Sequence, residues 1–205
     1  MNMNLLLYAI SDGNNLPAIE AAIAGGITML QLRAKALPDH ELLSLAHSVK
    51  QLTDKHGVPL IINDRPDIAK EVDAAGCHLG PADGDLRAAR ALLGPEKILG
   101  ATAKTLEQAL AAQAAGADYL GSGAVFGSAT KLDATRMPLE KFREICSAVR
   151  IPVVAIGGID CENIARLAGC GMAGFAIVGG IFGAVDVEGT AKELREKAEL
   201  CLTSR

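Results

Sequence analysis

Short apolar runs alternate with longer amphipathic stretches from one end of the 205-residue chain to the other. Eight runs have the length and aliphatic composition of buried strands: Leu5–Ile10, Met29–Leu32, Pro59–Ile62, Gly76–Leu79, Ile98–Ala101, Tyr119–Gly121, Val153–Ile156 and Phe175–Val178. The amphipathic, helix-like stretches include Leu16–Ala24, Asp39–Lys55, Leu86–Leu93, Thr105–Ala115, Leu139–Val149 and Gly189–Leu202. Strands that alternate with helices favour a parallel sheet, and eight repeats favour its closure. We therefore expect an α/β fold, a (β/α)8 TIM barrel, with residues 1–205 in a single domain.

Two of the predicted strands run directly into glycine pairs, Gly157-Gly158 and Gly179-Gly180. Glycine uncovers the backbone amides and lets a ligand approach closely. The loops after the last two strands of such barrels often bind a phosphate group. We therefore expect a phosphate cradle there, although the glycines could also serve only to relieve crowding at the strand ends.

Polar side chains gather where other predicted strands end. Alternation along the second strand places Gln31, Arg33 and Lys35 on one side, so that an amide and two cations reach the mouth of the barrel. Asn63 follows the third strand and Thr102 follows the fifth. These residues predict a site for an anionic ligand at the carboxyl ends of the strands.

Two carboxylates accompany these residues, Asp64 after the third strand and Asp83 after the fourth. Mg²⁺ prefers oxygen ligands and usually takes one or two carboxylates together with phosphate oxygens and water. The pair therefore predicts a magnesium-bound polyphosphate. The alternative is that Asp64 caps a helix beginning near Pro66, and that Asp83 caps the helix that follows it.

The longest segment without a periodic pattern is Ser122–Pro138. Loops of this length inside a compact domain are usually functional. The segment carries Ser128, Thr130 and Lys131, which adds two hydroxyls and a cation to the predicted site.

Composition excludes several function classes. A net charge of -4 argues against nucleic acid as the main partner. The start of the chain lacks a basic and apolar leader, and no stretch has the length of a membrane span, so we expect neither export nor membrane insertion. The five cysteines have no metal-ligand spacing, and their odd number indicates reduced thiols in the cytoplasm.

His78 is the one histidine within a predicted strand. A lone histidine in a strand is more often a hydrogen-bonded core residue than a catalytic base, and no Ser-His-Asp or Cys-His pattern accompanies it. We expect a structural role for its ring.

The chain resembles the thiamine phosphate synthase family, whose close relatives are the thiazole tautomerases, over nearly its whole length. The residues that carry the resemblance are Leu7-Tyr8-Ala9-Ile10-Ser11-Asp12, Gln31-Leu32-Arg33-Ala34-Lys35, Ile62-Asn63-Asp64-Arg65, His78-Leu79-Gly80, Ala117-Asp118-Tyr119, Thr130-Lys131 and Ala155-Ile156-Gly157-Gly158-Ile159. The resemblance implies a transferase that joins 4-amino-2-methyl-5-pyrimidinylmethyl diphosphate to a thiazole phosphate and releases pyrophosphate. A dissociative substitution assisted by Mg²⁺ is implied, and the oligomeric state is left open between monomer and homo-oligomer.

The resemblance also implies a role for each matching position. Asp64 and Asp83 would bind Mg²⁺, and Gln31 would hold the pyrimidine. The diphosphate would be held by Arg33, Lys35, Asn63 and Lys131, of which Arg33, Asn63 and Lys131 would serve catalysis. Hydroxyls would come from Thr102, Ser128 and Thr130, and the thiazole phosphate would lie on the amides of Gly158, Gly179 and Gly180.

Some positions depart from the family pattern. Gly127-Ser128 stands for Pro-Thr, Ala124 and Pro81 stand for Pro and Gln, Thr102 stands for Ser, and Gly179 stands for Ser. Two alternatives remain: an isomerase like the thiazole tautomerases, and a non-catalytic barrel that binds a phosphorylated metabolite. The tautomerases carry a catalytic histidine at the position of Ala124, and a mere binding protein would not need the acidic pair or Lys131.

Overall fold

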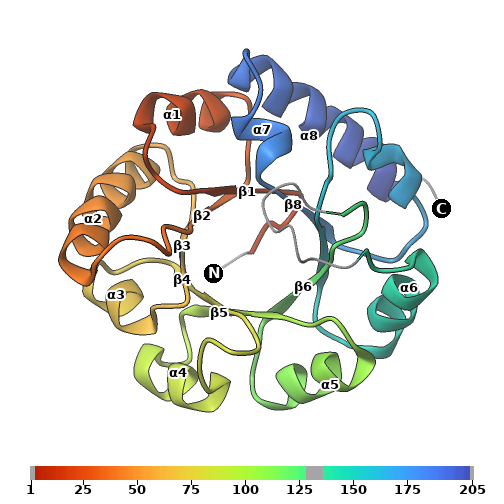
Figure 1. Ribbon diagram of the computed structural model, residues 1–205, viewed down its shortest axis with the longest axis horizontal. Helices are drawn as coiled ribbons and strands as arrows, with labels where there is room; N and C mark the ends of the chain where they lie inside the picture. Colours follow the sequence, from red (N-terminus) through yellow and green to blue (C-terminus); the bar gives the residue numbers. More distant parts are fainter. Residues whose placement is uncertain (1–2, 128–135, 204–205) are drawn as a thin grey trace.

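Eight parallel strands close into a barrel in which each strand pairs with the next and β8 returns to β1 (Figure 1). The computed structural model describes residues 3–127 and 136–203. The strands are β1 Leu7–Ser11, β2 Met29–Leu32, β3 Leu60–Asn63, β4 Gly76–Leu79, β5 Ile98–Thr102, β6 Tyr119–Gly123, β7 Val153–Ile156 and β8 Gly174–Ile177. The predicted (β/α)8 barrel is therefore confirmed.

Helices form a ring outside the strands (Figure 1). They are α1 Leu16–Ala24, α2 Asp39–Lys55, α3 Pro66–Glu71, α4 Leu86–Leu93, α5 Leu106–Ala114, α6 Leu139–Ala148, the 3₁₀ helix η1 Ile164–Leu167, α7 Gly179–Phe182 and α8 Val187–Thr203. Side-chain caps start several of them: at α1, for example, Asn15 accepts from the Ala18 amide, and at α5 Thr105 accepts from the Gln108 amide. Between β7 and β8 the helical segment is the 3₁₀ helix η1, and α7 is a short helix that begins at the second glycine pair.

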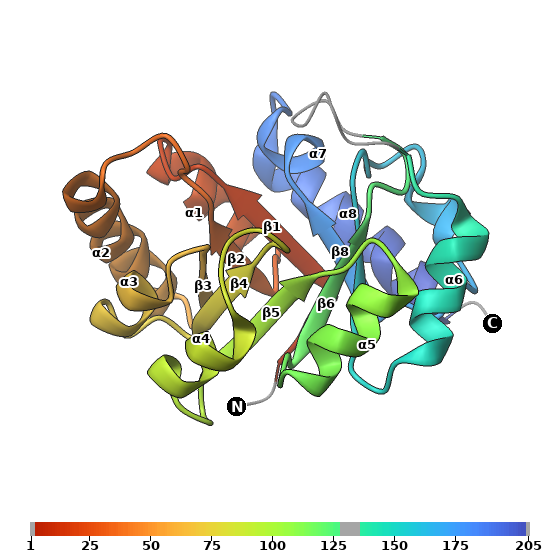
Figure 2. The ribbon, with the colours of Figure 1, turned by 60° about the horizontal axis from the view of Figure 1, so that its bottom comes forward.

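The amino end of the barrel is closed by the beginning of the chain. The first strand begins at Leu7 rather than at Leu5, because the chain makes a turn at Leu6. Leu5 is buried in the interior with Ile61 and Ile98, and Met3 packs against the same cluster. The first described residues accordingly lie at the end of the barrel opposite α7 (Figure 2). Ligands can therefore reach the interior from the carboxyl end.

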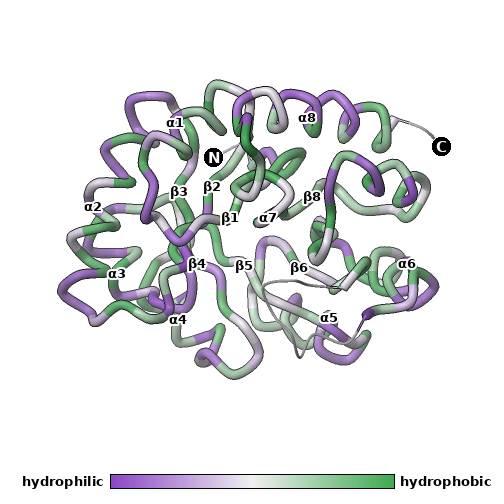
Figure 3. The backbone as a smooth tube through the Cα atoms, turned by 45° about the horizontal axis from the view of Figure 1, so that its top comes forward, coloured by the Kyte–Doolittle hydropathy of each residue, from purple (hydrophilic) through white to green (hydrophobic). Residues whose placement is uncertain are grey.

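Two cores follow from the period-two alternation of the strands. Side chains such as Tyr8, Tyr119 and Val154 fill the barrel interior, whereas their strand neighbours pack outward against the helices. Hydrophobic stretches run along the strands, and hydrophobic and hydrophilic stretches alternate along α2 and α8 (Figure 3). Among the described residues, none of the helices combines the length and the apolar character that a bilayer crossing requires.

Candidate active site

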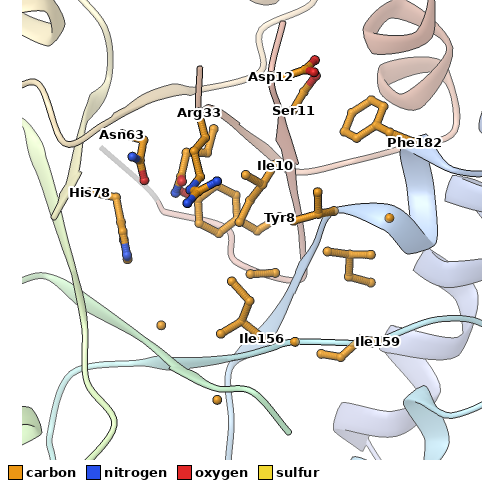
Figure 4. Close-up of a pocket in the computed structure, with 18 of the residues that line it drawn as sticks. Tyr8, Ile10, Ser11, Asp12, Arg33, Asn63, His78, Ile156, Ile159 and Phe182 are labelled. Atoms are coloured by element: carbon orange, nitrogen blue, oxygen red, sulfur yellow. The ribbon is translucent and has the colours of Figure 1, made fainter. Parts of the chain in front are cut away.

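A cavity of about 880 Å³ opens at the carboxyl ends of the strands. Every predicted site residue that the structure describes lines it: Gln31, Arg33, Lys35, Asn63, Asp64, Asp83, Thr102, Gly158, Gly179 and Gly180. Figure 4 shows Arg33, Asn63 and His78 pointing into this space, with Ile156 and Ile159 across from them. The cavity thus brings together residues from six strands and their loops, because the carboxyl ends of all the parallel strands meet at one end of the barrel.

Asp64 and Asp83 converge on the ammonium group of Lys35. Its Nζ lies 2.5 Å from Asp64 Oδ2 and 3.4 Å from Asp83 Oδ1. A Cβ at Gly80 would lie 2.3 Å from Asp83 Oδ2, so glycine at the end of β4 makes room for this carboxylate. Asp64 has a positive φ of 63°, which turns the chain out of β3 before α3 begins. The two carboxylates and one cation form an acidic pair with a shared counter-ion.

The alternative role of these aspartates as helix caps is wrong. The N-cap of α3 is Arg65, which makes no side-chain capping bond. The N-cap of α4 is Asp85, whose carboxylate accepts from the Arg87 amide. Neither Asp64 nor Asp83 is therefore a helix N-cap, and both carboxylates are available to the cavity.

The two carboxyl groups differ in proton affinity. Burial raises the pKa of Asp64, and the nearby Asp83 carboxyl adds to the rise, whereas Lys35 opposes it. Burial also acts to raise the pKa of Asp83, but its hydrogen bond with Asp64 and the charge of Lys35 outweigh burial and lower it. A cation placed between the two would favour the ionised form of both.

Further polar side chains line the same mouth. Lys104 lies two residues beyond Thr102, the last residue of β5, and lines the cavity, although it is not among the predicted site residues. The alternation that selected Arg33 and Lys35 would have found it, because it stands two residues beyond the end-of-strand Thr102. Ser11 and Asp12 at the end of β1 also line the cavity.

The glycine pairs line the opposite side of the cavity. At three of the four positions a side chain would clash with neighbouring atoms, which explains why glycine stands there. A Cβ at Gly157 would lie 2.4 Å from the Ala124 Cβ, and one at Gly158 would lie 2.9 Å from the Gly127 carbonyl oxygen. A Cβ at Gly180 would lie 2.3 Å from the Ile159 carbonyl oxygen. Among the described residues, no atom of the surroundings lies within 4 Å of a Cβ placed at Gly179.

Gly179 therefore faces open space, in contrast to the other three glycines. With Gly180 it begins α7, and the first amides of a helix have no partner within it. The neighbouring loop is fixed by Asn163, whose Nδ2 donates to the Gly158 carbonyl oxygen at 2.8 Å. Backbone groups thus reach the cavity on the β7–β8 side.

Beneath the mouth, His78 is held in a buried hydrogen-bond network. Its Nδ1 lies 3.0 Å from the Tyr119 hydroxyl, and its Nε2 lies 2.9 Å from Thr102 Oγ1. The ring is 8% exposed. The predicted structural role of His78 agrees with these contacts.

Three predicted site residues, Ser128, Thr130 and Lys131, lie outside the described residues. Within the described ranges 3–127 and 136–203, no three or more His, Cys, Asp or Glu side chains gather as a metal-binding group.

The fold and the cavity define the class of protein: a (β/α)8-barrel enzyme whose site opens at the carboxyl ends of its strands. The profile of the thiamine monophosphate synthase family matches residues 7–181, and the chain belongs to that family. The resemblance noted in the sequence is thereby confirmed.

Individual relatives extend this similarity along the chain. A thiamine-phosphate synthase 2 from Streptococcus pneumoniae is 47% identical over 190 residues, which cover 93% of this chain and 90% of the relative. A thiamine-phosphate synthase from Clostridium tetani is 43% identical over 199 residues, covering 94% and 95%. The solved structure of a thiamine phosphate pyrophosphorylase from Pyrococcus furiosus is 38% identical, with a TM-score of 0.90 over 97% of this chain and 98% of that chain.

Proposed function

We propose that the chain is a thiamine-phosphate synthase, a transferase that joins 4-amino-2-methyl-5-pyrimidinylmethyl diphosphate to 4-methyl-5-(2-phosphoethyl)thiazole and releases pyrophosphate. One observation carries the proposal beyond family membership. The acidic pair, Arg33, Asn63 and the open glycine Gly179 line a single cavity, which gives two anionic substrates separate places beside one another.

In this mechanism the bond from the methylene carbon to the diphosphate oxygen breaks first, and both bonding electrons leave with the diphosphate. The pyrimidine amino group stabilises the resulting cation, and the lone pair of the thiazole nitrogen then forms the new bond to carbon. No proton has to leave that nitrogen, so no general base is needed. The work of the protein is positioning and stabilisation of the departing charge.

Arg33, Lys35 and Asn63 would hold the diphosphate. The Arg33 side chain points into the cavity from the end of β2, and Asn63 points in from the end of β3 (Figure 4). Two cations and an amide at this position favour the anion that develops as the bond breaks. Gln31 would hold the pyrimidine, and Thr102 would add a hydroxyl. The assignments of Ser128, Thr130 and Lys131 remain predictions from the sequence.

The acidic pair fits Mg²⁺. Asp64 and Asp83 supply two oxygen ligands that are not used for helix capping, and Mg²⁺ takes its remaining ligands from phosphate oxygens and water. When bound, the ion would neutralise the leaving diphosphate as a Lewis acid. The position of Lys35 supports this role, because its ammonium group contacts both carboxylates and so shows that the pair can bind a cation.

The thiazole phosphate would lie on the amides of Gly158, Gly179 and Gly180. Open space at Gly179 supports this, since a ligand can approach the backbone there. An isomerase like the thiazole tautomerases is disfavoured, because Ala124 lines the cavity with a methyl group that cannot transfer a proton.

We further propose that residues 1–205 act as one catalytic domain in the cytoplasm. All five cysteines are free thiols, which supports a reducing compartment.

The proposed function is tested by incubating the intact chain with both substrates and Mg²⁺, and by detecting thiamine phosphate and pyrophosphate chromatographically. We expect equal amounts of the two products. Heat stabilisation by the thiazole phosphate without any coupled product would instead favour the non-catalytic binding protein.

A further inference from the structure

A continuous chain of side-chain hydrogen bonds crosses the barrel interior below the cavity. Gln31 Nε2 donates to the Tyr8 hydroxyl at 2.6 Å, and this hydroxyl lies 2.8 Å from that of Tyr119. The Tyr119 hydroxyl lies 3.0 Å from His78 Nδ1, and His78 Nε2 lies 2.9 Å from Thr102 Oγ1. The chain therefore joins β2, β1, β6, β4 and β5, and both of its ends, Gln31 and Thr102, line the cavity.

The barrel is shaped to hold this chain. Tyr8 is 1% exposed and Tyr119 is fully buried. A Cβ at Gly100 would lie 2.2 Å from Tyr119 Cζ, so a glycine on β5 leaves space for the Tyr119 ring. Burial raises the pKa of both tyrosines, which keeps each hydroxyl neutral with one proton to donate.

Counting protons gives the hydrogen-bond chain a direction. An amide nitrogen only donates, so the Tyr8 hydroxyl accepts from Gln31. Its own proton then goes to the Tyr119 hydroxyl, which is the other hydrogen-bond partner of this buried group among the described residues. Tyr119 then directs its proton to His78 Nδ1. A neutral imidazole carries one proton, which is therefore on Nε2 and is donated to Thr102 Oγ1. The Thr102 proton is left to point away from His78.

We propose that Tyr8, Tyr119 and His78 are positioning residues, which form a one-way hydrogen-bond chain from Gln31 and fix Thr102 as a donor toward the cavity. Phosphate oxygens only accept hydrogen bonds, so this direction suits a phosphorylated ligand at Thr102. The same direction leaves the Gln31 carbonyl oxygen as an acceptor for an amino group. The identity of both ligand groups rests on the proposed function, whereas the direction of the chain does not.

The opposite direction is chemically distinct. It requires the Gln31 amide to present its oxygen to Tyr8, the His78 proton to lie on Nδ1, and Thr102 to donate to His78 Nε2. Thr102 would then have no proton for a phosphate oxygen. The tautomer of His78 consequently reports the direction of the whole chain.

The first test is ¹⁵N NMR of the intact chain with labelled histidine at neutral pH and without substrate. The spectrum of His78→Gln identifies the His78 signals among the four histidines. We expect a protonated Nε2 and an unprotonated Nδ1 in the unsubstituted chain, and a mixture of tautomers in Tyr119→Phe. A proton on Nδ1 of the unsubstituted chain, alone or in an imidazolium ion, would overturn the proposal.

The second test is a double-substitution cycle on kcat/KM for the pyrimidine diphosphate. Thr102→Val should lower it roughly tenfold, the effect of losing one hydrogen bond to a charged group. Tyr119→Phe should lower it several-fold in the unsubstituted chain and not at all in Thr102→Val, because Tyr119 acts through Thr102. If the reductions in kcat/KM of the two single variants multiplied in the double variant, Tyr119 would act independently of Thr102 and the proposal would be overturned.

The matched control is Ser122→Ala, also on β6. It removes a buried hydroxyl that donates to the Ala103 carbonyl oxygen and takes no part in the hydrogen-bond chain from Gln31 to Thr102. Its melting temperature measures the cost of losing a buried hydroxyl in this strand, and its kcat/KM should stay at the unsubstituted value. Failure to form thiamine phosphate would refute the proposed function alone, because the tautomer is measured without substrate.

Discussion

The two sides of the cavity present different groups to a ligand: charged side chains on one side, and backbone with apolar side chains on the other. On the β2–β4 side, charged side chains line the cavity: Arg33, Lys35, Asp64 and Asp83. On the β7–β8 side the glycine pairs expose backbone, and the side chains around them are mainly apolar, with Ile156, Ile159 and Phe182 lining the cavity. In the proposed function, the β2–β4 side would therefore bind through side chains, which a substitution can remove, and the β7–β8 side would bind through backbone groups, which a substitution can only cover.

This difference determines which kind of substitution should impair binding on each side. Removal of one charged side chain on the β2–β4 side takes away a whole interaction and leaves its partners unbalanced. On the β7–β8 side there is little to remove, and added volume is what disrupts the site. Substitutions of opposite kinds should thus separate the two sides.

The largest effect is expected from the acidic pair. Asp64→Asn and Asp83→Asn should each lower kcat by roughly a hundredfold or more, since a metal ion on the leaving group acts mainly in the transition state. EDTA should abolish the activity of the unsubstituted chain, and added Mg²⁺ should restore it.

The matched control for these two variants is Asp67→Asn in α3, because Asp67 pairs with Arg65 and does not line the cavity. Steady-state kinetics should show its kcat within a factor of about two of the unsubstituted value, as surface substitutions usually do. Full activity in chelator would contradict the metal role of the pair.

A smaller effect is expected from crowding on the other side. Gly180→Ala places a methyl group 2.3 Å from the Ile159 carbonyl oxygen and should cost about 1–3 kcal/mol of stability. Gly179→Ala enters open space and should leave the melting temperature unchanged. Thermal unfolding of the two variants measures the contrast, and equal losses would show that Gly179 is as crowded as Gly180.

The smallest expected effect is the pH dependence of stability. The pKa of Asp64 is raised by burial, so the folded chain holds this proton more tightly than the unfolded chain, and stability falls as pH rises from about 4. Asp64→Asn removes that loss and should melt at the same or a higher temperature at neutral pH.

Asp83 should behave in the opposite way. Its pKa is lowered, so its carboxylate contributes stability above the ordinary aspartate pKa, and Asp83→Asn should melt lower at neutral pH. Equal destabilisation by Asp64→Asn and Asp83→Asn in melting curves would contradict this difference between the two carboxyl groups.

Much of the fold and of the β2–β4 side could be predicted from the sequence, because both depend on local rules. Apolar periodicity indicates the strands, and alternation delivers Gln31, Arg33 and Lys35 to the same mouth. The sequence alone leaves the role of Asp64 and Asp83 open, since an aspartate before a helix has the same local signature as a cap. The structure decides between the roles, because the N-caps of α3 and α4 are Arg65 and Asp85.

Other features depend on contacts between distant residues. The hydroxyls of Tyr8 and Tyr119 meet across the barrel although the residues are 111 positions apart. Crowding at Gly180 comes from the carbonyl of Ile159, which belongs to the loop after β7. No local sequence pattern distinguishes Gly180 from the open Gly179, so the role of each glycine can be inferred only from the folded structure.

The separation of the two sides is tested most directly by calorimetric binding of each substrate alone to Arg33→Ala and Gly179→Val. Arg33→Ala should weaken binding of the pyrimidine diphosphate roughly tenfold or more, as expected for the loss of a charged hydrogen bond, and leave thiazole phosphate binding unchanged. Gly179→Val should do the reverse, because its side chain covers the backbone on the β7–β8 side. If each variant weakened both substrates equally, the cavity would not be divided between them.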